Sequence, residues 1–249
     1  MIPLLLATAL SACAGAKAPN TPVAAPPNPA QVALVGLTQA AQLLAAGSRS
    51  YDPLTLTRAA RSLSACASSA GADAHQCAAL GTRAAWLLSC VQEAQGKQHD
   101  ALASAVLAGD LAETAVSGLT PTAETHALLA DAYMRRAWLS ATPDSIKFGA
   151  KAVWELRTVV SPTAQSLEVQ AVLARRRYFL PGILGGDTSA AVADFERLQA
   201  LDPQADLYPY YLGLALREQG HPQAAKAAFQ KALALDPDNA LARAALGLK

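Results

Sequence analysis

The chain of 249 residues is long enough for one repeat domain or two small globular domains. Apolar residues make up 52% of it but aromatic residues only 5%, so the apolar content is mostly Ala and Leu, which are strong helix formers. Strand-like runs of β-branched and aromatic residues are scarce, and the net charge of +1 provides no overall field that would recruit nucleic acid. The composition therefore predicts an all-α protein that does not bind nucleic acid.

The N-terminus carries a pattern typical of an export signal. Ile2–Leu10 is an apolar segment that is too short to span a bilayer, which takes roughly 20 residues, and suits the core of a secretory signal. The next residues, Leu10-Ser11-Ala12-Cys13, resemble the lipobox of bacterial lipoproteins. This resemblance implies that residues 1–12 are a signal peptide and that Cys13 carries a lipid. Residues 1–3 depart from the pattern because they lack Lys and Arg, and the alternative is a disordered apolar N-terminus.

Residues 13–29 connect this predicted anchor to the helical part of the chain. The stretch is rich in Pro and Ala, which cannot build a core, so we expect a disordered tether behind the lipidated Cys13. Residue Ala14 stands where an Asp would mark retention in the inner membrane. The resemblance thus implies a chain anchored by lipid in the bacterial cell envelope, facing the periplasm, at the outer rather than the inner membrane.

Residues 30–122 are predicted to form helical pairs with a degenerate repeat pattern. One pair covers 29–46 and 55–68 and has no consensus residues. A second begins near Ala74, contains Leu80-Gly81 and reaches Gly118 through unusually long helices. Two interpretations remain for this part, namely true repeats or a bundle of Ala-rich helices.

Three cysteines lie within these pairs. Cys77 and Cys90 are thirteen residues apart on one predicted helix, hence roughly 20 Å apart, and a disulfide needs Cα atoms within about 7 Å. Cys66 ends one helix and Cys77 begins the next, so this pair is placed for a disulfide. The alternative is three buried thiols that pack as small apolar groups. No metal site is expected, because the four His are scattered and none is spaced from a Cys as metal ligands are.

Residues 123–249 show a repeating pattern of helix pairs. Leu129-Ala130 and Tyr133 fit the first helix of a unit that starts near Ala123. An Ala followed four residues later by an aromatic residue recurs at Ala150–Trp154 and Ala191–Phe195. The interval between the two aromatic residues exceeds 34 by seven residues, which we assign to a loop within 179–187 that contains one Pro and three Gly.

The last unit, beginning near Asp206, is similar to the tetratricopeptide repeat of 34 residues. Its matching positions are Leu212, Gly213, Ala225, Phe229, Ala232 and Pro237. Pro209 and Leu216 depart from the usual Trp and Tyr. The resemblance implies a tetratricopeptide-type α-solenoid of about five antiparallel helix pairs, closed by a C-terminal capping helix over 240–249.

In such a solenoid the first helix of each pair lines a concave groove. Carried onto this chain, the groove positions are Asp131, Met134, Arg135, Arg176, Arg177, Tyr210, Leu214 and Arg217. Four Arg in one groove would suit an acidic peptide, a carboxylate or an anionic solute. The alternative is that Arg175–Arg177 is a solvated helix end stabilised by the helix dipole.

No catalytic pattern stands out in the sequence. It has no phosphate-binding loop and no nucleophile elbow, so we expect no enzyme activity and no cofactor. The resemblance implies an envelope-anchored scaffold that binds another envelope protein or peptide in its groove. The alternative is a solute-handling lipoprotein that partners a transporter's substrate-binding protein, because the turn 180–187 weakly resembles T-component lipoproteins of that type.

Overall fold

The computed structural model describes residues 29–69, 71–118, 120, 122–158 and 166–248. Within these residues the chain forms eleven α-helices and no strand. No helix in this part is both long and apolar enough to cross a membrane. The predicted signal peptide, most of the tether and Cys13 lie outside the described residues.

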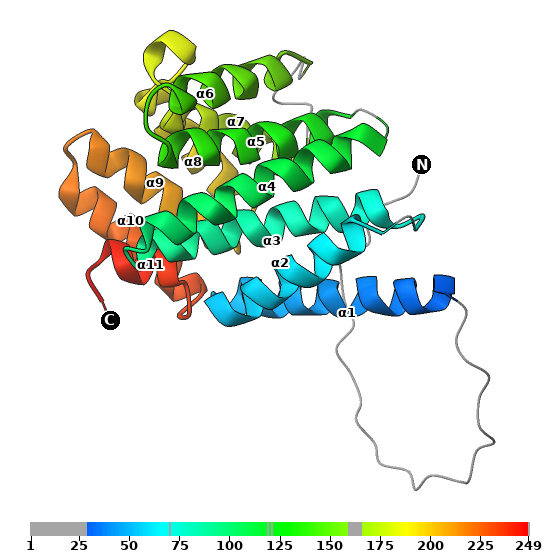
Figure 1. Cartoon of the computed structure of the whole chain (residues 1–249). Helices are drawn as coiled ribbons and strands as arrows, with labels where there is room; N and C mark the ends of the chain where they lie inside the picture. Colours follow the sequence, from blue (N-terminus) through cyan, green and yellow to red (C-terminus); the bar gives the residue numbers. More distant parts are fainter. Residues whose placement is uncertain (1–28, 70, 119, 121, 159–165, 249) are drawn as a thin grey trace, which may run out of the picture.

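The helices follow one another as antiparallel pairs (Figure 1). The pairs are α1 (Pro29–Ser50) with α2 (Pro53–Ala67), α3 (Ala74–Ala94) with α4 (Gln98–Gly118), α5 (Ala123–Leu139) with α6 (Asp144–Glu155), α7 (Leu167–Phe179) with α8 (Thr188–Leu201), and α9 (Leu207–Glu218) with α10 (Pro222–Leu235), followed by the single helix α11 (Ala240–Ala245). Five pairs and a terminal helix confirm the predicted all-α solenoid.

Short polar side chains and glycines define where the helices begin and end. Asp187 accepts a hydrogen bond from the Ala190 backbone N–H at 3.0 Å, which starts α8 after the seven-residue insertion. Gly247 has a φ of 71°, and the Leu248 N–H donates to the Arg243 carbonyl at 2.9 Å. This left-handed glycine ends α11 at Ala245, so the terminal helix is shorter than the predicted 240–249.

The last pair packs as the repeat pattern predicts. A Cβ at Gly213 would lie 2.5 Å from the Phe229 ring, so only glycine allows α9 and α10 to approach this closely. Ala225 and Ala232, on the same side of α10, are buried with Phe229. The small residues are therefore required by the distance between the helices, and the large ring fills the space that they leave.

Packing is continuous from the N-terminal pairs into the repeats. One apolar cluster joins Leu63 of α2 and Ala108 of α4 to Tyr133 of α5 and Val172 of α7. Cys66 and Cys77 form a disulfide between α2 and α3, with Cα atoms 5.8 Å apart. Cys90 is a free, buried thiol.

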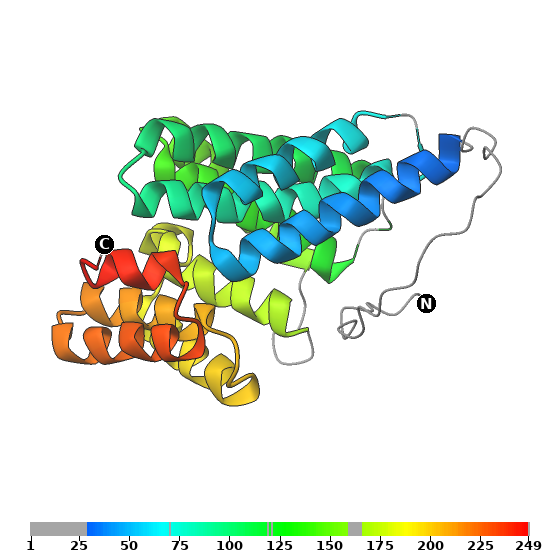
Figure 2. The same ribbon diagram turned by 90° about the horizontal axis from the view of Figure 1, so that it is seen from below.

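The two ends of the array meet, which the sequence did not predict. Helix α11 packs against both α10 and α3 (Figures 1 and 2). The Tyr51 hydroxyl, in the turn between α1 and α2, donates to Asp206 Oδ2 at 2.6 Å, and Asn239 Nδ2 donates to the same oxygen at 2.6 Å. We call these three residues the closure contact. Leu241 of α11 is buried in the same cluster as Tyr51, so the solenoid closes on itself.

Candidate binding pocket

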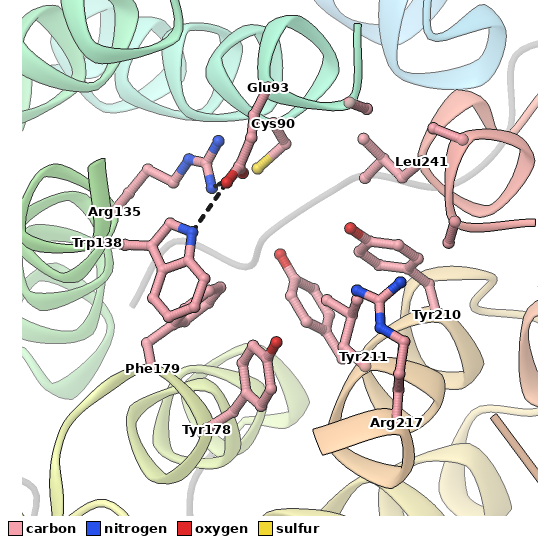
Figure 3. Close-up of a pocket in the computed structure, with 14 residues that line it drawn as sticks. Cys90, Glu93, Arg135, Trp138, Tyr178, Phe179, Tyr210, Tyr211, Arg217 and Leu241 are labelled. Atoms are coloured by element: carbon pink, nitrogen blue, oxygen red, sulfur yellow. Dashed lines mark hydrogen bonds and ion pairs between the residues drawn. The ribbon is translucent and has the colours of Figure 1, made fainter. Parts of the chain in front are cut away.

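Closure of the array converts its concave face into a pocket. The pocket has a volume of about 260 Å³ and is lined by the first helix of four pairs, α3, α5, α7 and α9, together with α11 (Figure 3). Its principal side chains are Cys90, Glu93, Arg135, Trp138, Tyr178, Phe179, Tyr210, Tyr211, Arg217 and Leu241. The predicted face of the solenoid is thus the hollow one, but α11 bounds it on one side, so it is a half-open pocket and not a continuous groove.

A network of charged hydrogen bonds forms the wall between α3 and α5. Arg135 is only 2% exposed, and its Nη1 lies 2.6 Å from Glu93 Oε2. Arg135 also donates from Nε to Ser89 Oγ and from Nη2 to the Ser89 carbonyl, both at 2.9 Å. The second Glu93 oxygen accepts from Trp138 Nε1 at 2.9 Å. Both carboxylate oxygens are therefore occupied, and the pair is electrically neutral as a unit.

Aromatic rings build the opposite wall. Phe179 makes edge contacts with Trp138, Tyr178 and Tyr211, with ring centroids 5.2, 4.9 and 6.0 Å apart. The hydroxyls of Tyr178, Tyr210 and Tyr211 point toward the centre of the pocket (Figure 3).

All three tyrosines are uncharged at neutral pH. Burial raises the pKa of Tyr178 to about 12, and burial also raises the pKa of Tyr210 and Tyr211. Burial likewise raises the pKa of the Cys90 thiol to about 11, which keeps this cysteine protonated. The pocket therefore offers neutral hydroxyl groups and a thiol with little nucleophilic character.

Arg217 differs from Arg135, the other arginine that lines the pocket. It is exposed at the pocket, its guanidinium carbon lies 5.7 Å from the Phe229 ring centroid, and no carboxylate of the described residues lies within ion-pair distance of it. Trp138 is 46% exposed and also lines the pocket. These two side chains mark its mouth.

Four of the predicted groove residues come together at this pocket. Arg135, Tyr210, Leu214 and Arg217 all line it. Met134, predicted as a groove residue, is fully buried in the core beneath it. Position 134 therefore contributes packing and is not available to a ligand.

Asp131, another predicted groove residue, lies in a buried ion pair. Arg175 donates from Nε and Nη2 to the two Asp131 oxygens at 2.9 and 2.8 Å. Both residues are buried between α5 and α7. This bidentate geometry ties the two helices together and leaves the carboxylate no capacity for a partner.

The prediction that Arg176 and Arg177 line the groove is wrong. Arg176 points to the loop before α8, where its Nη2 lies 3.4 Å from the Leu184 carbonyl. Arg177 forms an ion pair with Asp194 of α8 at 2.6 Å. Successive helical residues differ by about 100° in direction, so three consecutive arginines cannot share one face. The alternative of a solvated helix end does not describe Arg175, because it is buried and paired.

The sequence reasoning missed the aromatic and α3 parts of the pocket. Trp138 follows Arg135 by three residues and was a recognisable candidate, as were Tyr178 and Tyr211 on first helices. Cys90 and Glu93 lie on α3, which is also a first helix, but the degenerate repeat pattern of its pair does not give the register that would place them. Across the described residues, no group of His, Cys, Asp and Glu could hold a metal ion.

Comparison with known proteins supports the fold. The family model of the tetratricopeptide repeat matches residues 210–239. A solved structure of a thermophilic TPR protein in Thermus thermophilus is 17% identical, covering 86% of this chain and 97% of that one with a TM-score of 0.54. YrrB, described as a TPR protein with an unusual peptide-binding site, is 18% identical over 85% of this chain and 98% of its own, with a TM-score of 0.35. None of the curated proteins compared with the sequence matches it. The chain thus contains a tetratricopeptide repeat within a TPR-type solenoid fold, which suggests protein–protein interaction.

Proposed function

We propose that this chain is an envelope-anchored scaffold that binds a partner protein at the mouth of the pocket, without catalysing a reaction. The observation that supports this best is the pair of exposed side chains at the mouth, Trp138 and Arg217. Trp and Arg are enriched among residues that dominate interface energies. The unpaired charge of Arg217 favours an acidic contact on the partner.

The experiment is affinity purification from solubilised envelopes with the full chain and three variants. Trp138→Ala and Arg217→Ala remove the two mouth residues, and Arg61→Ala removes an exposed arginine of α2 far from the pocket as a matched control. We expect a specific partner that is recovered with the wild type and Arg61→Ala but lost with both mouth variants. A partner retained equally by all four proteins would place the interface elsewhere and contradict the proposal.

The anchoring is a separate part of the proposal. It rests on the apolar segment Ile2–Leu10 and the Leu-Ser-Ala-Cys pattern that ends at Cys13. Labelling cells with a fatty-acid analogue should mark the wild type and not Cys13→Ala. Membrane fractionation should then find the labelled chain with the outer membrane. Persistent labelling of Cys13→Ala would refute the lipid anchor without affecting the proposed interface.

A second function, the handling of a solute together with a transporter's substrate-binding protein, is favoured by the concave shape and small volume of the pocket. A scaffold that holds an extended peptide needs an open groove, whereas a solute site is concave and largely preformed. Native mass spectrometry of the chain purified from its envelope would test this function. A co-purifying small molecule, absent from a variant in which Leu214→Trp fills the pocket, would support it.

A further inference from the structure

The charges that line the pocket leave one positive charge unbalanced. Arg135 and Glu93 neutralise each other at 2.6 Å. Arg217 is the third charged lining residue, and no carboxylate of the described residues pairs with it. A negative group placed in the pocket beside Arg217 would meet a positive charge that no carboxylate of the described residues neutralises. The lining is therefore complementary to a ligand with a single negative charge.

The hydroxyl groups reinforce this preference. Tyr178, Tyr210 and Tyr211 direct their oxygens into the pocket, and within the described part of the chain none of the three forms a hydrogen bond (Figure 3). A phenol that faces a cavity without a protein partner needs water or a ligand atom to satisfy its O–H. Three O–H donors beside an unpaired guanidinium form a cluster of donors aimed at one region. Such a cluster suits an oxygen anion.

Size and wall chemistry restrict the rest of the ligand. A volume of about 260 Å³ corresponds to roughly nine waters at about 30 Å³ each, which is below the range for drug-sized ligands. Trp138 and Phe179 present apolar ring surface opposite Arg217 (Figure 3). A phosphate dianion would be left with one charge uncompensated, close to Glu93. An apolar ring with one carboxylate satisfies both the donors and the walls.

We propose that the pocket binds a small aromatic carboxylate, with its carboxylate on Arg217 and the tyrosine hydroxyls and its ring against Trp138 and Phe179. The proposal deepens the second function above, since it names the class of solute, and it rests on the pocket being a binding site. It does not depend on the lipid anchor or on a protein partner. The same chemistry could be presented by the terminal carboxylate of a peptide, and the test separates the two sources.

Isothermal titration of the purified full chain with benzoate, benzamide and a tripeptide ending in phenylalanine is the primary test. Benzamide has the size and ring of benzoate but no charge. We expect benzoate to bind and to raise the melting temperature, and benzamide to bind at least roughly tenfold more weakly, because a charge-assisted bond is lost. Equal binding of the two, or no binding of benzoate, would overturn the proposal. Binding of the tripeptide alone would assign the pocket to a protein partner and would also overturn it.

Variants identify the donors. Arg217→Gln should weaken benzoate binding by roughly tenfold or more, and Tyr210→Phe by several-fold, since each removes a donor but keeps most of the side-chain volume. Arg61→Gln, on the exposed face of α2, should bind like the wild type. Urea midpoints of all variants test whether they fold. Unchanged affinity in a folded Arg217→Gln would refute the assignment. If benzoate binds but no envelope partner is captured, this inference is supported and the proposed scaffold function is contradicted.

Discussion

The closure contact can be tested by removing one oxygen atom. Tyr51→Phe keeps the ring within the cluster formed with Leu56, Val91 and Leu241 but deletes the hydroxyl that donates to Asp206 Oδ2 at 2.6 Å. A hydrogen bond to a charged acceptor contributes about 1.5–3 kcal/mol. Asp206 would retain the bond from Asn239 Nδ2 at 2.6 Å, so the loss should lie near the lower limit of that range.

We therefore expect Tyr51→Phe to lower the free energy of unfolding by about 1.5–2 kcal/mol, measured from urea midpoints. Hydrogen exchange should increase in α11, which the contact holds against α3. Tyr208→Phe is the matched control, because the Tyr208 hydroxyl is half-buried and has no hydrogen-bond partner among the described residues.

A double-mutant cycle separates the contact from unrelated effects of either substitution. Tyr51→Phe combined with Asp206→Ala should cost less than the sum of the two single changes by about 1–2 kcal/mol. If Tyr51→Phe changes stability by less than about 0.5 kcal/mol, as surface substitutions do, the ends of the array are not held together by this contact. Additive effects in the cycle would lead to the same conclusion.

Three further predictions concern the interior. Arg175→Leu should cost about 3–5 kcal/mol because it leaves the buried Asp131 unpaired, and Asp131→Leu in the same chain should restore most of that loss in urea unfolding. Reduction of the Cys66–Cys77 disulfide should lower the free energy of unfolding by about 2–3 kcal/mol, measured from urea midpoints with and without reductant. An unchanged midpoint would mean that the loop closed by this disulfide does not constrain the unfolded chain. Burial raises the pKa of Tyr211, so the contribution of its protonated hydroxyl to the free energy of unfolding is complete below about pH 10. Above that pH the contribution is lost by about 1.4 kcal/mol per pH unit, which urea unfolding measured at a series of alkaline pH values would detect.

Local pattern was sufficient to predict the helical pairs and the position of the last repeat. Gly213, Ala225 and Phe229 have the required spacing because two helices of one unit must touch, and that requirement acts over a few turns of chain. The same reasoning applies to Cys66 and Cys77, which flank a short connection. Contacts between consecutive helices can therefore be predicted from the spacing of residues in the sequence.

The site was predicted only in part, because it depends on direction and on distant contacts. Arg135 and Arg217 line the pocket, whereas Arg176 and Arg177 do not, because an error of one residue turns a side chain by about 100°. The seven-residue insertion before α8 removed the fixed interval that would have corrected the register.

Closure itself joins Tyr51 to Asp206 and Asn239, which lie 155 and 188 positions further along the chain. A single Tyr–Asp hydrogen bond of this kind leaves no periodicity in the sequence, unlike the repeated apolar faces of the helices. It also adds residues to the site, because Leu241, Ala244 and Ala245 of α11 line the pocket where α11 lies against α3. Reading the concave face from the repeats alone therefore omits the part of the lining that α11 contributes.

Closure also decides what kind of ligand the concave face can accept. An open solenoid presents its first helices as a continuous groove, along which an extended peptide can bind several units. Here α11 contributes Leu241, Ala244 and Ala245 to the lining and shortens that groove to a pocket of about 260 Å³. The interior has room for one compact group, while Trp138 and Arg217 remain at the mouth for contacts with a larger partner. A small ligand inside and a protein outside would therefore share Arg217, and each would alter the affinity of the other by the same factor.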